Sequence, residues 1–410
     1  MITHLLDPLA ISDPYEVYRG LREHAPITWL PEHHAWFVAT HADVDAAFRD
    51  TRLSSDRLSP LEARLSPTNQ ALLGNTFDLL RGWMVFHDPP GHERLRGPVR
   101  RAFTPKAVER LRDPVIEIVD EHLDELEARL LDGDTVDLIE EFAFPVPAIV
   151  IAELLGVPSE DRDEFKTWSD QLAGIVFGAS NRPDQAATAA AGSARFAAYF
   201  TDLIERYRRD PGDNLVSALI EAAAVADPPL EATELVGACT LLLFGGHETT
   251  TNLIGNSVHT LLTHPGAHAT FLEDRDGRSR ALEELHRFDG SSKVMVRSSA
   301  VDHERGGVEI SAGDTVFLGI GAANRDPAVF ERPDDLVLAR PNAHRHLGYG
   351  YGLHFCLGAP LARLETDVAI GRLVDRLPGL RLAVDESALS WGATILGRGL
   401  TTLPVTVSPR

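Results

Sequence analysis

The stretch Arg345-His-Leu-Gly-Tyr-Gly-Tyr-Gly-Leu-His-Phe-Cys-Leu-Gly-Ala-Pro-Leu-Ala-Arg-Leu-Glu365 contains Cys356, one of only two cysteines in the chain. Three glycines at alternate positions before the cysteine do not suit a packed strand, and they favour a backbone that turns sharply or lies flat against a planar ligand. Pro360 and the apolar spacing after it predict a helix. Cys356 therefore precedes a helix N-terminus, where a thiolate is favoured, and we interpret it as a ligand or a nucleophile.

Three other interpretations of this cysteine are open. A lone cysteine is most often a small buried apolar residue. A zinc site could combine Cys356 with His344, His346 and His354, although no C-x-x-C pair is present and the spacing is irregular. A nucleophilic cysteine would need a base partner, which the sequence does not single out.

The pattern Tyr349-Gly350-x-Gly-x-His354-x-Cys356-x-Gly358 resembles the haem-binding loop of the cytochrome P-450 family of haem-thiolate monooxygenases. The resemblance implies a mainly α fold with a small β region, as one domain over residues 1–410, built around haem b with Cys356 as the axial ligand of the iron. The family usually has Phe at the position of Tyr349. The extra hydroxyl of tyrosine could tune the potential of the iron.

A long helix is predicted over roughly residues 230–263, between Pro228-Pro229 and Pro265. The paired glycines Gly245-Gly246 weaken its middle, and Glu248 and Thr249 follow directly. This segment resembles the oxygen-activation motif of the same family. The resemblance implies that Gly245 lies against the cofactor and that Glu248 and Thr249 deliver protons to oxygen.

The resemblance extends to the remaining cofactor contacts. It implies that His92, Arg96, Arg297 and His354 bind haem propionates, while Tyr349 and Gly350 line the loop around the sulfur. Glu284 and Arg287, at i and i+3 of a predicted helix, correspond to the structural ion pair of the family. The third member of that pair's network is left open between Arg340, Arg345 and His346.

The substrate pocket is expected to be largely apolar. Its candidate residues are Phe86, Leu242, Phe244, Val294, Met295 and Ile395. The reaction implied is insertion of one atom of O2 into a small organic substrate, as hydroxylation, epoxidation or oxidative dealkylation. A haem-binding sensor or carrier is the alternative, but it would not need Glu248 and Thr249.

Electrons are expected from a separate protein. The sequence has no G-x-G-x-x-G after a strand, no P-loop and no cysteine cluster, so no fused reductase domain is predicted and NAD(P)H acts indirectly. A basic segment that includes Arg94, Arg100 and Arg101 is a candidate docking face for a ferredoxin or flavodoxin-type donor. Its alternative interpretation is a solvated helix face.

The overall charge and the N-terminus narrow the partners. Lys+Arg 39 against Asp+Glu 61 gives a net charge of -22, which argues against nucleic acid and anionic membranes. The N-terminus lacks the features of a signal peptide, and two cysteines suit a reducing cytosol, so a cytoplasmic protein is expected.

Elsewhere the pattern predicts an amphipathic helix from Asp13 and a strand pair at residues 27–30 and 35–39. Helices are expected over residues 114–225, with a soft stretch at 173–198, and a loop region facing the substrate over 59–86. Short strands are predicted within residues 293–297, 304–320 and 380–407.

Overall fold

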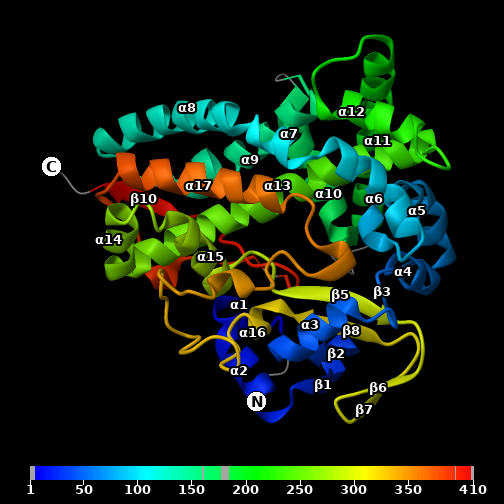
Figure 1. Cartoon of the computed structure of the whole chain (residues 1–410), viewed down its shortest axis with the longest axis horizontal. Coiled ribbons are helices and arrows are strands. Elements are labelled where there is room, and N and C mark those ends of the chain that lie inside the picture. The colour runs from blue at the N-terminus through cyan, green and yellow to red at the C-terminus, as the bar shows by residue number, and fades with distance from the viewer. Residues whose placement is uncertain (1–4, 159–160, 177–183, 393, 408–410) are drawn as a thin grey trace. The chain divides into compact units, whose positions relative to one another are not determined.

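The computed structural model describes residues 5–158, 161–176, 184–392 and 394–407 (Figure 1). The described chain divides into two compact units. Unit 1 comprises residues 1–53, 112–147 and 248–410, and unit 2 comprises residues 54–111 and 148–247. Two helices, α9 (Pro145–Leu155) and α13 (Ala232–Thr263), run from one unit into the other.

Unit 1 contains most of the described strands and half of the helices. Its helices are α1 (Pro8–Ser12), α2 (Pro14–His24), α3 (His41–Arg49), α8 (Arg112–Leu131), α14 (Pro265–Glu273), α15 (Arg278–Asp289), α16 (Ile320–Ala323) and α17 (Ala359–Arg376). Its strands are β1 (Ile27–Leu30), β2 (Ala35–Val38), β4 (Val136–Asp137), β5 (Val294–Ser299), β6 (His303–Arg305), β7 (Val308–Ile310), β8 (Thr315–Gly319), β9 (Leu380–Leu382) and β10 (Pro404–Val407). The short strand β3 (Leu53–Ser54) lies at the unit boundary.

The main sheet has the order β1-β2-β8-β5-β3, in which β2 and β8 are parallel and β5 is antiparallel to β8. Its two faces bury different clusters because side chains alternate along each strand. Val294 packs with Tyr18 and Phe37 on one face. Met295 packs with Phe48 and other residues on the opposite face.

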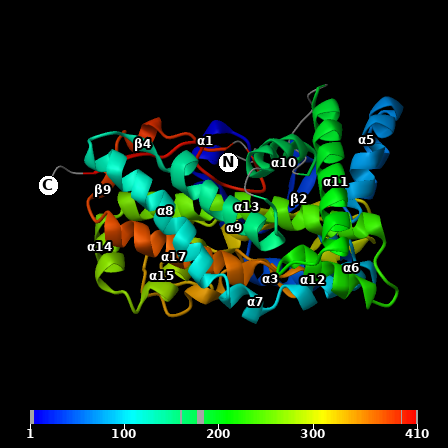
Figure 2. The same ribbon diagram turned by 90° about the horizontal axis from the view of Figure 1, so that it is seen from above.

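The helix that follows the cysteine is held by a neighbouring helix of the same unit. Helix α17 lies alongside α8 in both views (Figures 1 and 2). Arg372 on α17 pairs with Asp120 on α8, and the Arg376 guanidinium lies 2.6 Å from the Glu127 carboxylate. These ion pairs are partly exposed, so each one contributes little to stability, but together they fix the register of the two helices.

Unit 2 is helical in the part of the chain that the structure describes. Its helices are α4 (Leu58–Arg64), α5 (Pro67–Leu80), α6 (Gly91–Ala102), α7 (Pro105–Glu109), α10 (Arg162–Val176), α11 (Gln185–Arg209) and α12 (Leu215–Ala224). Helix α11 packs on α10 through an aromatic cluster in which the Phe165 ring of α10 meets the Tyr199 ring of α11 at 5.0 Å between ring centroids. It also packs beside α5 (Figure 2), where the Thr76 and Ser193 hydroxyls are 2.7 Å apart.

Most of the predicted elements are confirmed, and two segments differ. The amphipathic helix, the first strand pair and the long helix lie within two residues of their predicted bounds. Residues 59–86, expected as a loop region, fold mainly into α4 and α5. In the soft stretch 173–198, residues 185–198 belong to helix α11, and residues 177–183, which include part of the expected turn, lie outside the described residues.

No helix in the described part of the chain is both long and apolar enough to cross a membrane.

Candidate active site

The cysteine lies in an exposed loop that turns twice before helix α17. Gly350 and Gly352 have φ values of 68° and 71°, which is the left-handed region that glycine enters without strain. The Cys356 N–H donates to the Tyr349 carbonyl at 2.9 Å and closes the loop. Cys356 is exposed, and so are its apolar neighbours Leu353 (49%) and Phe355 (39%). The predicted position of the cysteine, just ahead of a helix whose first turn contains a proline, is confirmed.

Tyr349, at the start of the cysteine loop, packs in a cluster of aromatic and charged side chains. The Tyr349 ring lies beneath the Arg363 guanidinium at 4.4 Å and meets the His286 ring edge-on at 4.4 Å. Burial raises the pKa of the Tyr349 hydroxyl, so this group stays protonated. Glu283 accepts from His346 and Arg363, whose hydrogen bonds outweigh the effect of burial and hold the pKa of Glu283 below its usual range. The residue in place of the usual Phe is thus packed between charged and aromatic neighbours.

The ion pair Glu284–Arg287 is completely buried. Arg287 donates to both carboxylate oxygens of Glu284 at 2.6 and 2.8 Å, and both side chains have 0% exposure. Arg340 supplies the third member, with its Nε 3.0 Å from each carboxylate oxygen. Burial is the main cause of the lowered pKa of Arg287, and Glu284 opposes it. Of the three candidates, Arg345 is exposed and His346 binds Glu283 instead.

Two other residues expected at the cofactor also belong to unit 1. Arg297 is 5% exposed and lies in β5, where its guanidinium donates to the Val296 carbonyl at 2.9 Å. His354 is half-buried in the single 3₁₀ turn that precedes Cys356. Both positions are compatible with a role in binding an anionic group.

The middle of α13 presents small and polar side chains on one face. Gly245 and Thr249, four residues apart, are both exposed, whereas Thr250 (3%) and Thr251 (6%) are buried. A Cβ atom added to Gly245 would meet nothing within 4 Å. A Cβ atom on Gly246 would lie 2.7 Å from the Ile151 side chain. The two glycines therefore differ in role, because Gly245 leaves open space and Gly246 allows close packing.

Unit 2 contains His92 and Arg96, the two remaining residues that are expected to bind haem propionates. His92 is 2% exposed in the first turn of α6, and half-buried Arg96 follows one turn later. Burial and then the nearby Arg96 charge lower the pKa of His92, so its ring is neutral at pH 7. Arg94 is bound to Glu234 in an ion pair, which makes it unsuitable as a free docking charge. Arg100 and Arg101 are exposed.

The expected pocket residues fall into separate groups. In unit 2, Phe86 and Phe244 both pack on Trp83, with ring centroids at 6.0 and 5.0 Å. Leu242 is half-buried. In unit 1, Val294 and Ile395 share one face of the sheet. Met295 packs in the cluster on the other face, and its place in the substrate pocket stays a prediction.

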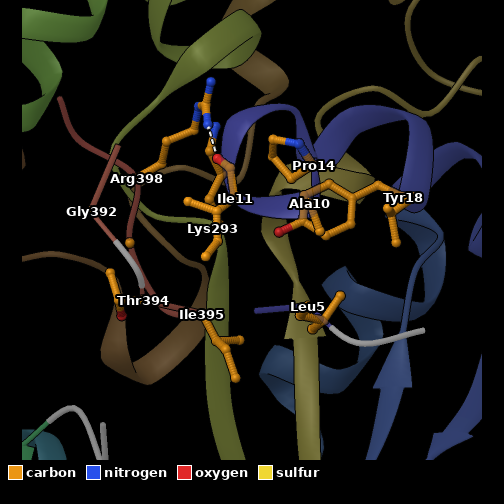
Figure 3. A pocket seen from close by; sticks show the side chains of 12 residues that line it. Leu5, Ala10, Ile11, Pro14, Tyr18, Lys293, Gly392, Thr394, Ile395 and Arg398 are labelled. Atoms are coloured by element: carbon orange, nitrogen blue, oxygen red, sulfur yellow. Dashed lines mark hydrogen bonds between the residues drawn. The ribbon is translucent and has the colours of Figure 1, made fainter. Parts of the chain in front are cut away.

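A buried charged cluster, which the sequence reasoning missed, lies beside Ile395. Lys293 donates to Asp289 at 2.8 Å and to the Tyr15 hydroxyl, and Arg398 approaches Asp289 at 3.1 Å. Figure 3 shows the adjoining cavity of about 20 Å³, where Arg398 donates to the Ile11 carbonyl at 2.6 Å. Burial lowers the pKa of Lys293 to about 8. Lys293 was predicted as the first residue of a strand, and that position gave no signal of these partners.

The zinc interpretation is not supported. Within the part of the chain that the structure describes, no group of three or more His, Cys, Asp or Glu residues is arranged to hold a metal ion. Of the histidines considered for such a site, His346 binds Glu283.

The cysteine loop fits a haem. Its sulfur-bearing residue is exposed in a loop flattened by two glycines and bordered by exposed apolar side chains, as a planar apolar ring requires. Cys356 would supply the axial thiolate. These features define a haem-thiolate protein.

Comparisons with known proteins agree with this class. A family model described as Cytochrome P450 matches residues 279–378. The vitamin D(3) 25-hydroxylase of Pseudonocardia autotrophica is 42% identical over 402 residues, which cover 97% of this chain and 95% of that protein. The 6-deoxyerythronolide B hydroxylase of Saccharopolyspora erythraea is 38% identical, with 96% of each chain covered. The solved structure of cytochrome P450 PksS from Bacillus subtilis 168 is 33% identical, with a TM-score of 0.88 and 100% of each chain covered.

The chain therefore belongs to the cytochrome P450 family, and it is a P450 monooxygenase of the bacterial type. Its family implies haem b as cofactor, O2 as co-substrate, and electrons that originate in NAD(P)H and arrive through partner proteins.

Proposed function

We propose that this enzyme inserts one oxygen atom into a largely apolar small molecule, by hydroxylation, epoxidation or oxidative dealkylation. The observation that carries the proposal is the exposed, glycine-flanked Cys356 ahead of helix α17, and the exposed Thr249 of α13 supports it. When bound, the haem supplies the oxygen activation that the protein itself lacks. The named relatives act on vitamin D3 and 6-deoxyerythronolide B, which supports a substrate with extensive apolar surface.

The chain's own residues would bind and orient the cofactor. Cys356 supplies the thiolate, and His92, Arg96, Arg297 and His354 bind the propionates, for which guanidinium forks and ring N–H groups are suited. Glu284, Arg287 and Arg340 brace the segment that precedes the cysteine, because Glu284 also accepts from the Val337 N–H at 3.0 Å. We propose that both units act together as one domain over residues 1–410.

Two residues of α13 would handle protons. Glu248 is half-buried and can exchange a proton with solvent through its carboxyl, while the adjacent exposed Thr249 offers a hydroxyl that donates and accepts. Together they would hold a proton at Thr249 Oγ1 and replace it from Glu248. Positioned proton transfer of this kind contributes about 10² to 10⁴ in rate.

The electron donor would be a ferredoxin or flavodoxin-type protein in the cytoplasm. Exposed Arg100 and Arg101 are the candidate contacts in unit 2. In unit 1 a groove of about 650 Å³ beside the cysteine loop is lined by Arg345 and exposed Tyr351, among others, while its Arg49 and Arg363 side chains are paired with Asp45 and Glu283. Cationic side chains with an exposed aromatic ring suit an acidic protein partner.

Substitution of Thr249 tests the proposed function. Thr249→Ala should keep haem, fold and substrate binding, while most electrons are diverted to hydrogen peroxide because the hydroxyl that holds the proton is gone. The measurement is the ratio of oxidised product to NAD(P)H consumed, with a surrogate reductase system. Thr263→Ala is the control, because the Thr263 hydroxyl donates within the same helix to the His259 carbonyl. An unchanged ratio in Thr249→Ala would require another proton path, and a protein that only binds haem would form no product.

A further inference from the structure

A buried acid links the helix that follows Cys356 to the helix that contains Thr249. Glu365 lies in α17 and is 1% exposed, and its carboxyl accepts a hydrogen bond from the Thr250 hydroxyl in α13. Its Oε1 atom has no hydrogen-bond partner among the described residues. Both residues belong to unit 1. The contact therefore joins the segment of the axial ligand to the immediate neighbour of Thr249.

Burial of the Glu365 carboxyl has a free-energy cost that packing alone does not explain. Burial is the dominant cause of its strongly raised pKa, and no cation is among the groups that oppose it. A carboxyl without a cation is kept neutral in such a place, because an isolated buried charge is far more costly. An apolar side chain of similar volume would fill this space at lower cost. A structural account of α17 packing thus leaves the choice of an acid unexplained.

The position of the hydrogen bond between Thr250 and Glu365 explains why residue 365 is an acid. Successive residues of an α-helix are about 100° apart, so a contact that fixes Thr250 also fixes the direction in which Thr249 points. Toward the N-terminus, Gly245 and Gly246 weaken the helix, and Gly246 packs closely against the Ile151 side chain. Toward the C-terminus, the next anchor is Asn256, which donates to the Asp289 and Arg398 carbonyls at 3.1 and 3.0 Å. Glu365 therefore provides an anchor only one residue away from Thr249.

We propose that Glu365 is a positioning residue, whose buried carboxyl holds Thr250 and thereby sets the rotation of α13 at which the Thr249 hydroxyl is presented. The proposal rests on the proposed role of Thr249. It assigns Glu365 no proton transfer to the reacting oxygen.

The test compares three variants of the haem-loaded enzyme. Glu365→Met removes the hydrogen bond and keeps side-chain length, Thr250→Val removes it from the other side with nearly the same shape, and Glu365→Gln keeps an acceptor. Amide hydrogen exchange is followed by mass spectrometry over residues 244–256. Loss of one buried hydrogen bond should make exchange about tenfold faster in the Met and Val variants and leave the Gln variant close to wild type. The ratio of product to NAD(P)H should fall in the first two and recover with Gln.

Several outcomes would overturn the proposal. Unchanged exchange in both Glu365→Met and Thr250→Val would show that the link does not hold the helix. Uncoupling in Glu365→Gln as large as in Glu365→Met would show that the carboxyl acts through its proton and not through position. Should Glu365→Met fail to fold, the Val and Gln variants decide the question. Because exchange is measured independently of turnover, failure of the Thr249→Ala test would contradict the proposed function without deciding the exchange result.

Discussion

At the scale of single residues, the Glu284 carboxylate is the most completely enclosed charge of the candidate site. Its two oxygens accept hydrogen bonds from four protein N–H groups, two of Arg287, one of Arg340 and the backbone N–H of Val337. Arg287 in turn donates to the Asn324 and Pro333 carbonyls at 2.9 and 2.8 Å. The pair therefore holds the segment 324–340 in place through hydrogen bonds to residues at both of its ends.

Glu284→Ala should destabilise the protein by about 3 to 5 kcal/mol, because it leaves two buried guanidiniums without a counter-charge. The expected product is haem-poor or insoluble, and chemical denaturation together with haem content measures the effect. Asp335→Ala is the control, since the Asp335–Arg332 pair has the same i,i+3 spacing but side-chain exposures of 54% and 68%. Its cost should be about 0.5 kcal/mol or less. Equal, small costs for both variants would contradict the bracing role.

Cys356→His should abolish the strongly red-shifted Soret band that the reduced carbon monoxide complex of a thiolate-ligated haem shows, because imidazole replaces the thiolate. Cys239→Ala provides the control. Cys239 is buried in α13, and burial raises the pKa of its thiol to about 12, which keeps it protonated and unsuited to bind iron. The ligand assignment fails if the band survives in Cys356→His or is lost in Cys239→Ala.

Residue identities at the site were predictable where one short motif defines them. The turn at Cys356 follows from the glycine spacing, whereas the Glu284–Arg287 pair was implied by the family resemblance; the structure shows the cysteine ahead of a helix and the pair formed. Arg340 was one of three candidates, because spacing in the chain does not say which cation reaches a buried carboxylate. The contact between Glu365 and Thr250 was not predicted, since the two residues lie far apart in the sequence and neither belongs to a motif that names the other.

At the scale of elements, the charged cluster around Asp289 joins α2, the end of α15, the start of β5 and the C-terminal segment. Lys293 and Arg398 both face Asp289, and the Arg325 guanidinium lies over the Tyr15 ring at 3.6 Å. Burial, with a smaller contribution from the Arg398 charge, lowers the pKa of Lys293 to about 8 despite the favourable effect of Asp289. Lys293 therefore gives up its proton more readily than an exposed lysine.

The stability of this junction should depend on pH. The pKa of Lys293 is 10.5 in the unfolded chain and about 8 in the folded one, so between these values the unfolded state binds more protons. Stability therefore rises with pH across this window, by up to about 1.4 kcal/mol per pH unit from this group. Lys293→Met lacks the effect, so wild type should gain relative to the variant between pH 8 and 10 in denaturant unfolding. Parallel pH profiles would show that Lys293 keeps its ordinary pKa.

Element boundaries were predictable where prolines or caps mark them. Helix α13 was expected from the prolines on either side, and α2 from Asp13, whose carboxylate accepts from the Tyr15 N–H at 3.0 Å. Helix α5 was missed because apolar residues occur on several of its faces and Leu72 is exposed. The start of α5 could nevertheless have been predicted from its capping residues, since Ser66 accepts from the Asn69 N–H and Pro67 is the first residue of the helix. The start of α11 was judged soft, although alanine is the strongest helix former.

At the scale of the whole molecule, a net charge of -22 conflicts with binding an acidic electron donor. Two acidic proteins repel each other at long range, so productive encounter needs a local cationic surface whose field dominates at short distance. Arg94 is neutralised by Glu234, whereas Arg100 and Arg101 are exposed cations at the C-terminal end of α6.

Reversal of Arg100 or Arg101 to Glu should therefore slow reduction of the enzyme by a ferredoxin, with little change in haem content, because both side chains are exposed. Stopped-flow reduction rates are measured over a range of ionic strength. Salt should slow the wild type, since exposed charges are screened within about 10 Å at 0.1 M, and should slow the reversed variants less. Arg64→Glu, at an exposed position of α4, changes the net charge equally and should leave the rate near wild type. If the Arg64, Arg100 and Arg101 variants slow equally, total charge controls the encounter, and rates indifferent to salt would remove docking at this surface.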